Sequence, residues 1–182
     1  MVLEDRLLVW KFKRGDKCAL STIYVKYIDD LLRIAASLLK DRTEAHDVVH
    51  DVFIDFVNMQ KQFKLTGSLK GYLMTCVANK ARNVNRTMSR KQTVSFDSVE
   101  PVISGISSPD EMIVYDEQFQ HLCDAMAELP YEQREAVVLH IHGELKFKAV
   151  AQIQQTTIQT TCSRYRYGID KLRLLLNGQV KL

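Results

Sequence analysis

The segment from Ser68 to Lys91 holds six basic residues and no acidic one, which is the clearest chemical signal in the chain. With 100° of rotation per residue, a helix here would place apolar side chains on one side and polar ones on the other. The polar side carries Thr75, Asn79, Arg82, Asn83, Arg86 and Arg90. Positive charges with amide groups between them neutralise phosphates and hydrogen-bond base edges. A solvated helix face is the alternative, but the absence of carboxylates favours nucleic acid as a ligand.

The second chemical pattern is His46-Asp47-Val48-Val49-His50, which places two imidazoles four residues apart. Two histidines at this spacing bind zinc in hydrolases that carry H-E-x-x-H on a helix. Here the acid is Asp rather than Glu, and no third ligand is recognisable. We therefore expect no metal and place both histidines on a polar surface. Stoichiometric zinc in the purified protein would revive the hydrolase interpretation.

Three aspartates, Asp47, Asp51 and Asp55, recur every four residues on the same predicted helix. Like charges at this spacing cost roughly a few tenths of a kcal/mol, and Asp47 near the helix start regains a comparable amount from the helix dipole. Such a stripe is either a solvated face or a docking surface for a basic partner. Both interpretations stay open at this point.

The composition is that of a soluble globular protein with enough apolar material for one large or two small domains. Of the 182 residues, 46% are hydrophobic and 26% are charged. No apolar run approaches the roughly 18 residues of a membrane span, and the amino terminus meets charged residues too early for a signal peptide. We therefore expect a cytoplasmic protein. The four cysteines lie far apart without a C-x-x-C pair, which favours reduced thiols over a disulfide framework.

Charge is unevenly distributed along the chain. Residues 1–90 hold 16 Lys or Arg and 10 Asp or Glu, residues 91–129 hold 1 and 8, and residues 130–182 hold 8 and 4. Two basic ends therefore flank an acidic middle. This arrangement predicts two separate contacts with a polyanion, joined by a segment that avoids or mimics it.

Apolar residues keep a helical period through most of the chain, so the fold is predicted to be all-α. Gly15 and Asp16 supply a break and a helix start, and Asp41 or Thr43 caps the following helix. Helices are expected over Lys17–Lys40, Glu44–Gln60, Ser68–Lys91 and Asp110–Glu128. Their expected buried positions include Leu20, Ile23, Tyr24, Tyr27, Leu31, Ile34, Ala35, Leu38, Leu39, Ala45, Val48, Val49, Val52, Phe53, Phe56, Leu69, Tyr72, Leu73, Cys76, Val77, Val84 and Met88.

Residues 92–109 are rich in serine and proline, and we expect them to form a flexible linker between two small helical domains. The domains would comprise residues 1–91 and residues 110–182. No internal packing is expected within the linker.

The carboxy-terminal part has the pattern of a helix-turn-helix. A helix from Pro130 ends at Gly143, a short helix spans about Lys146–Gln154, and Thr157 caps the last helix. Expected inward positions are Ala136, Val137, Leu139, Ile141, Ile158, Thr161, Tyr165, Gly168, Leu172 and Leu175. Outward positions near the amino end of the last helix, where a recognition helix meets base edges, are Gln159, Thr160, Ser163, Arg164, Arg166 and Tyr167.

Two separate segments resemble the same family. EAHDVVHDVFIDFV, followed by QFKLTGSLKGYLMTCVANKARNVNR, resembles the second conserved region of group-four, extracytoplasmic-function (ECF) RNA polymerase sigma factors of the sigma-70 family. LPYEQREAVVLHIHGELKFKAVAQI and TTCSRYRYGIDKLR resemble their fourth conserved region. The two motifs stand in the family's order and cover nearly the whole chain. Gln155 stands where the family usually has glycine, at a cost of up to about 1 kcal/mol if its φ is positive.

The resemblance implies a protein without a catalytic site or cofactor that lends promoter specificity to core bacterial RNA polymerase. Its expected partners are the clamp helices of the largest polymerase subunit, promoter DNA and, as a further possibility, an anti-sigma factor. The implied polymerase contacts are Asp47, His50 and Asp51. The implied minus-10 contacts are the Lys61–Ser68 loop with Asn79 at a flipped base and Lys64, Arg82, Arg86 and Arg90 on phosphates. The implied minus-35 contacts are Gln159, Thr160, Ser163, Arg164 and Arg166.

A helix-turn-helix transcriptional regulator is the alternative from another class of protein. Its amino-terminal domain would bind a protein or a small ligand, and it would bind a duplex operator without polymerase. Pull-down of core polymerase by the purified chain separates the two interpretations.

Overall fold

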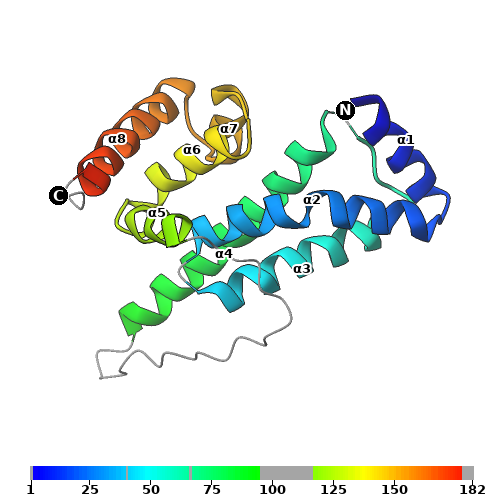
Figure 1. The fold of residues 1–182 in the computed structure, drawn as a ribbon, viewed down its shortest axis with the longest axis horizontal. Helices are drawn as coiled ribbons and strands as arrows, with labels where there is room; N and C mark the ends of the chain where they lie inside the picture. The colour runs from blue at the N-terminus through cyan, green and yellow to red at the C-terminus, as the bar shows by residue number, and fades with distance from the viewer. Residues whose placement is uncertain (1, 40, 66, 95–116, 178–182) are drawn as a thin grey trace.

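The computed structural model describes residues 2–39, 41–65, 67–94 and 117–177, and in these ranges the chain forms eight α-helices and no strand (Figure 1). The helices are α1 (Val2–Lys13), α2 (Lys17–Leu38), α3 (Arg42–Asn58), α4 (Leu69–Val94), α5 (Glu117–Ala127), α6 (Tyr131–Ile141), α7 (Phe147–Ile153) and α8 (Ile158–Asn177). The all-α prediction is confirmed. We call α1–α4 the amino-terminal bundle and α5–α8 the carboxy-terminal bundle.

The turn between α1 and α2 is set by two adjacent residues. Gly15 has a φ of +87°, and its N–H donates to the carbonyl of Phe12, while the N–H of Asp16 donates to that of Lys11. This is a Schellman ending, which glycine permits without a Cβ penalty. The Asp16 carboxylate then accepts from the N–H groups of Cys18 and Ala19 and starts α2, as predicted. The chain therefore reverses, and α1 packs on α2.

The core of the amino-terminal bundle forms where α2, α3 and α4 pack on one another. All six positions expected to be buried in α3 are buried. Phe56, at the centre, stacks on Phe12 with ring centroids 4.5 Å apart and meets the ring edge of Phe63 at 5.0 Å. Burying one such ring contributes roughly 1.5–3 kcal/mol. Phe63 therefore fixes the loop before α4 to the core.

Of the two predicted caps of α3, Asp41 is the one present, through a 2.7 Å hydrogen bond from the Thr43 N–H to its carboxylate. Other boundaries and faces in this bundle differ from the predictions. Tyr24 is 41% exposed, because its ring lies over the edge of the core against Phe53. α4 continues to Val94, so residues 92–94 are helical rather than linker. The rest of the expected linker, and the expected helix start at Asp110, lie outside the described residues.

The carboxy-terminal bundle packs α8 against α5, α6 and α7. Gly168 lets α8 approach closely, because a Cβ there would lie 2.9 Å from a methyl group of Val137. Two expected inward positions are wrong: Ile141 and Ile158 are 48% and 49% exposed. Both lie at helix ends, Ile141 at the last residue of α6 and Ile158 at the first of α8, where the neighbouring helix no longer covers the side chain.

The turn of the helix-turn-helix follows the predicted chemistry. Gln155 has a φ of +51°, the left-handed conformation that the usual glycine would adopt without strain. The Thr157 hydroxyl accepts from the N–H of Thr160 at 3.1 Å and caps α8. The predicted turn and cap are therefore both present.

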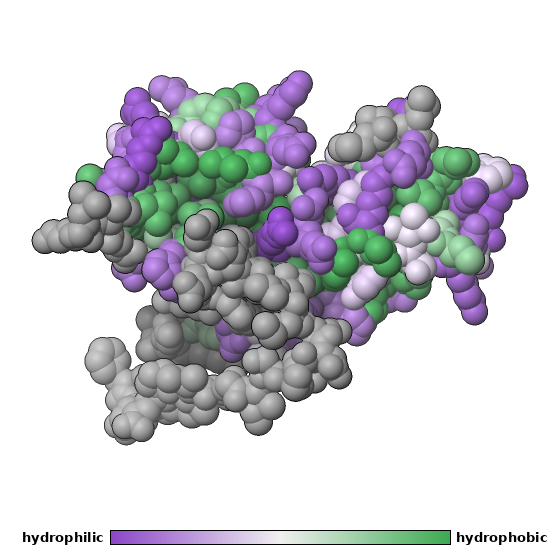
Figure 2. All heavy atoms as spheres, in the orientation of Figure 1, coloured by the Kyte–Doolittle hydropathy of each residue, from purple (hydrophilic) through white to green (hydrophobic). Residues whose placement is uncertain are grey.

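The two bundles contact each other directly. α5 and α6 pack on α2, and α6 and α7 pack on α4. Hydrophilic residues gather in the middle of the space-filling view, where the bundles meet (Figure 2). Among the described helices, none combines the length and apolar character that crossing a bilayer requires.

Candidate nucleic-acid interface

Helix α4 is the element that positions the predicted minus-10 residues. The Ser68 hydroxyl accepts from the N–H of Gly71 at 3.0 Å and starts the helix. Its buried side consists of Leu69, Leu73, Met74, Val77, Ala78 and Ala81. Val84 is only half-buried and Met88 is exposed, because this end of α4 projects beyond α2 and α3 (Figure 1). The apolar side predicted from periodicity was therefore too long.

The polar side of α4 is only partly open to solvent. Asn79, Asn83 and Arg86 are exposed, as is Lys64 in the preceding loop. Arg90 lies within α4, but its side chain is outside the described part of the structure. Arg82, predicted to bind phosphate, is instead engaged by the carboxy-terminal bundle.

The guanidinium of Arg82 binds two oxygens of that bundle. One terminal nitrogen lies 2.6 Å from a carboxylate oxygen of Glu135 in α6, and the other donates to the carbonyl of Ile153 at the end of α7, also at 2.6 Å. The side chain of Glu135 is 1% exposed and that of Arg82 is 29% exposed. Charge-assisted hydrogen bonds of this length are among the strongest in proteins. They join α4 of the amino-terminal bundle to α6 and α7 of the carboxy-terminal bundle.

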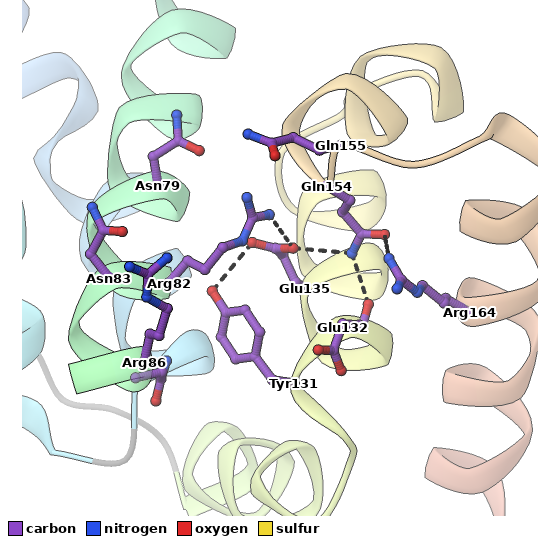
Figure 3. A pocket seen from close by; sticks show the side chains of 11 residues that line it. Asn79, Arg82, Asn83, Arg86, Tyr131, Glu132, Glu135, Gln154, Gln155 and Arg164 are labelled. Atoms are coloured by element: carbon purple, nitrogen blue, oxygen red, sulfur yellow. Dashed lines mark hydrogen bonds and ion pairs between the residues drawn. The ribbon is translucent and has the colours of Figure 1, made fainter. Parts of the chain in front are cut away.

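Glu135 is also the centre of a network within the carboxy-terminal bundle (Figure 3). Its carboxylate accepts from the Tyr131 hydroxyl at 3.2 Å and from the Gln154 amide at 3.0 Å. Burial, and then the Glu135 charge, raise the pKa of Tyr131, so its hydroxyl stays protonated and can donate. The side-chain amide oxygen Oε1 of Gln154 in turn accepts from the Arg164 guanidinium at 3.0 Å. Arg82 and Arg164, predicted to bind different promoter elements, are thus linked through two side chains.

The same residues line a cleft of about 690 Å³ between the bundles. Asn79, Arg82, Asn83, Asn85 and Arg86 line it from α4, and Tyr131, Glu132, Glu135, Gln154, Gln155 and Arg164 line it from the opposite side. Figure 3 shows Arg82 extending from α4 toward Glu135, and Arg164 extending from α8 toward Gln154. The structure therefore brings one predicted minus-35 residue and four residues of the α4 polar face into one cleft.

The other predicted minus-35 residues lie along the first turns of α8. Gln159, Thr160 and Arg166 are exposed and Ser163 is half-buried. The guanidinium of Arg166 lies 5.4 Å from the ring centroid of Tyr167, a distance compatible with a cation–π contact. These side chains remain available to a ligand at the amino end of the helix.

The predicted polymerase contacts lie on the outer side of α3. Asp47, His50 and Asp51 are exposed. Lys80 of α4 lies 3.4 Å from the Asp51 carboxylate and 2.9 Å from that of Asp55, and the hydrogen bond to Asp55 raises the pKa of Lys80. The acidic stripe is therefore partly neutralised by the neighbouring helix.

An apolar groove between α2 and α3 was missed by sequence reasoning. It has a volume of about 460 Å³ and is lined by Lys17, Leu20, Ser21, Tyr24, His50, Phe53, Ile54, Val57 and Asn58. Ile54 and Val57 are exposed. They occupy the outer side of α3, and apolar residues outside the predicted inner stripe were the signal that could have revealed the groove.

The histidine pair of the zinc pattern is exposed on α3. Among the described residues, no group of three or more His, Cys, Asp or Glu side chains is arranged to hold a metal ion.

Arg134 and Glu135 are two buried charged residues of α6 that the sequence analysis did not identify. Each lies four residues before a buried apolar residue, Val138 or Leu139, and so shares its side of α6. That spacing could have indicated their burial. Their partners in other helices, Leu38 for Arg134 and Arg82 for Glu135, could not be inferred from that spacing.

These features define a class of protein: an all-helical protein whose helix-turn-helix bundle packs against a basic helix. Residues 23–91 match the family model described as Sigma-70 region 2. The RNA polymerase sigma-H factor of Pseudomonas aeruginosa is 25% identical over 179 residues, covering 92% of this chain and 93% of the relative. The ECF RNA polymerase sigma-E factor of Escherichia coli K12 is 23% identical over 170 residues, covering 89% and 88%.

Solved structures share the fold over most of the chain. CnrH in complex with the cytosolic domain of CnrY superposes with a TM-score of 0.68 at 18% identity, covering 97% of this chain and 99% of that one. The sigma factor RpoE of Bartonella quintana, in complex with the anti-sigma factor NepR, gives 0.63 at 23% identity, covering 87% and 98%. The chain is therefore similar to ECF sigma factors of the sigma-70 family over most of its length, and residues 23–91 match their region 2. This similarity does not favour the operator-binding regulator.

Proposed function

We propose that this sigma factor binds core RNA polymerase, directs it to promoters and assists in melting them. The observation that carries the proposal is the α4 helix, whose polar side bears basic and amide groups and no carboxylate, in the segment that matches Sigma-70 region 2. Sigma factors are not enzymes, and the proposal includes no catalytic group and no cofactor. Since core polymerase works in the cytoplasm, the protein would act there.

The outer side of α3 is the proposed polymerase contact. Asp47, His50 and Asp51 would meet the clamp helices of the largest subunit, and the apolar groove beside them would accept apolar side chains of the same partner. An apolar centre with a polar rim is the usual composition of a protein interface. Lys80 would remain between Asp51 and Asp55 and limit the charge that the partner must match.

The amino-terminal bundle would also capture the non-template strand of the minus-10 element. Asn79 and the Lys61–Ser68 loop would surround an extruded base, and Lys64, Arg82, Arg86 and Arg90 would bind phosphates. Extruding a base costs roughly a few kcal/mol, which contacts to the flipped base offset. The support is the exposure of Asn79, Arg86 and Lys64 and the anchoring of the loop through buried Phe63.

The carboxy-terminal bundle would read the minus-35 duplex. The first turns of α8 would enter the major groove, with Gln159, Thr160, Ser163, Arg164 and Arg166 facing DNA. The domain organisation proposed from the sequence, residues 1–91 for polymerase and the minus-10 element and residues 110–182 for the minus-35 element, divides these tasks. An anti-sigma factor is a further proposed partner.

Run-off transcription tests the proposed function. The chain should support specific initiation with core polymerase and bind promoter duplex poorly alone, because each bundle offers few phosphate contacts whose affinities combine only on a common scaffold. Pull-down of core polymerase should weaken in Asp47→Ala and remain unchanged in Asp29→Ala, which removes the same charge from the exposed surface of α2. Tight binding of a duplex operator by the chain alone, with no effect on core polymerase, would show that the proposal is wrong.

A further inference from the structure

The outer side of α1 carries positive charge that the acids of the same segment do not balance. All the cations in residues 6–17 are exposed: Arg6, Lys11, Lys13, Arg14 and Lys17. The acids of this segment are engaged elsewhere. Lys26 of α2 lies 2.9 Å from the Glu4 carboxylate and 3.0 Å from that of Asp5, and the Asp16 carboxylate caps α2. None of the ion pairs formed among the described residues involves one of these exposed cations.

An exposed tryptophan stands in the middle of this charge. Trp10 is 50% exposed, although tryptophan side chains are on average highly buried. Arg6 lies one turn before it on the same side of the helix, and the guanidinium of Arg14, just past the helix end, lies 3.9 Å from the ring centroid. Leu7, also exposed, extends the apolar surface. We call Arg6, Leu7, Trp10, Lys13 and Arg14 the α1 surface. An aromatic platform flanked by cations is the combination that binds single-stranded nucleic acid, through base stacking and phosphate contacts.

Helix α1 lies against the loop to which the proposed function assigns base capture. The side chain of Gln60, just before the Lys61–Ser68 loop, donates to the carbonyl of Phe12 at 2.5 Å. The Phe12 ring stacks on Phe56, which contacts Phe63 within the loop. The described part of the chain between α3 and α4 runs past α1 (Figure 1). A strand that leaves the loop on this side therefore meets α1 next.

We propose that the α1 surface is a second binding surface for single-stranded DNA, on which a base of the displaced promoter strand stacks on Trp10. Arg6 and Lys13, one turn before and one turn after the ring, bind the adjoining phosphates. No residue of α1 lines the cleft between the bundles, so this surface is accessible in the arrangement that the structure shows. That the strand belongs to a promoter rests on the proposed function, whereas single-strand binding rests on the composition of the α1 surface.

Tryptophan fluorescence of the full chain reports on this surface directly, because Trp10 is the only tryptophan in the sequence. Oligothymidine of about 20 nucleotides should quench the emission as a base stacks on the indole ring, and added salt should weaken the effect. Poly-L-glutamate of equal charge controls for charge alone, and phosphatidylglycerol vesicles control for an anionic lipid surface. An absent response to oligothymidine, an equal response to poly-L-glutamate, or a response to vesicles only would overturn the proposal.

Fluorescence anisotropy of fluorescein-labelled oligothymidine separates stacking from charge. Trp10→Ala should weaken binding at least about fivefold, whereas Trp10→Phe, which keeps an aromatic ring, should stay within about twofold of the parent. Arg6→Gln should reduce the salt slope by roughly 0.7, the value for one phosphate on a single strand. Arg173→Gln, at an exposed position of α8, should leave the slope unchanged. Equal affinities of Trp10→Ala and the parent would contradict stacking on the indole.

Arg86→Ala in the same assay separates this inference from the proposed function. If oligothymidine quenches Trp10 and Arg86→Ala binds as tightly as the parent, the α1 surface stands and the assignment of α4 to DNA fails. If Arg86→Ala weakens binding and Trp10→Ala does not, the assignment of α4 stands and the α1 surface is not a DNA contact.

Discussion

The guanidinium of Arg134 donates a 3.2 Å hydrogen bond to the carbonyl of Leu38, 96 positions earlier in the chain. Leu38 ends α2, and its carbonyl also accepts from the Asn85 amide of α4 at 3.1 Å. Helix-end carbonyls lack partners within their own helix, so side chains from elsewhere commonly satisfy them. A single carbonyl oxygen therefore joins α2, α4 and α6.

Replacing Arg134 with methionine should destabilise the fold. Arg134 is buried, burial lowers its pKa, and its guanidinium also donates to the carbonyls of Ala127 and Leu129. Arg134→Met removes the donor to the carbonyls of Ala127 and Leu129, leaves the Leu38 carbonyl with Asn85 alone, and should lower the free energy of unfolding by about 2–3 kcal/mol. Urea denaturation measures the loss. Arg173→Met, at an exposed position of α8, should change it by less than about 0.5 kcal/mol, and equal effects would contradict this role for Arg134.

Gln155→Gly should stabilise the protein by roughly 0.5–1 kcal/mol. Gln155 has a φ of +51°, where a Cβ causes strain and glycine causes none. The matched control is Gln152→Gly in α7, which should destabilise by roughly 0.5–1 kcal/mol, because glycine weakens a helix. Thermal unfolding of both variants is the measurement. A loss of stability in Gln155→Gly would show that the turn does not carry this strain.

His142 should make stability depend on pH in mildly acid solution. Burial, followed by nearby Arg33, lowers the pKa of His142 below its ordinary value of 6.5, against the opposing effect of Asp30. At a given acid pH the unfolded chain therefore binds a proton at His142 more readily than the folded chain does. Neutral His142 contributes its full stabilisation of the fold above pH 6.5, and this contribution is lost as the pH falls through the lowered pKa. Urea denaturation across this range should show a weaker decline in His142→Asn than in the parent. His46→Asn, on the exposed side of α3, should retain the parent's profile; a parental profile in His142→Asn would contradict the assignment.

Substitutions at Asn79 and Arg86 should distinguish the capture of a base from the binding of phosphates. Arg86→Ala should reduce the salt slope of DNA binding by about one counterion. Asn79→Ala should impair promoter melting without changing that slope and should relax the preference at one minus-10 position. Permanganate footprinting at several salt concentrations, on promoters varied one base at a time, measures both effects. If Asn79→Ala melts every promoter as well as the parent does, the Lys61–Ser68 loop alone holds the base.

Arg164→Ala should weaken recognition of the upstream promoter element by about 1–3 kcal/mol if Arg164 makes a bidentate base contact. To make that contact its guanidinium must turn away from Gln154. The measurement compares initiation by Arg164→Ala on duplex and on pre-melted templates. Initiation should be reduced on the duplex template and unchanged on the pre-melted one. Arg173→Ala, at an exposed position farther along α8, is the control. Equal loss on both templates would assign Arg164 to folding instead.

The local features that the sequence predicted correctly depend on residues that are close to one another along the chain. Asp16 caps α2 through residues two and three positions away, and the positive φ of Gln155 belongs to a single turn. Arg82 and Glu135 are 53 positions apart in sequence, and their pairing depends on how the two bundles pack together. Helical periodicity describes one helix at a time and cannot predict such a pairing. For the same reason Arg82 was predicted to bind phosphate, whereas in the structure it binds Glu135 and the Ile153 carbonyl.

The distance along the chain between Arg82 and Glu135 also sets an order of events during synthesis. The 53 positions between them correspond to roughly 3–10 s at the usual rate of translation. The amino-terminal bundle is therefore complete in sequence while the segment that covers it is still being translated. During that interval the Glu135 carboxylate is not yet available to Arg82, so the α4 polar side of the nascent chain carries its positive charge without that partner.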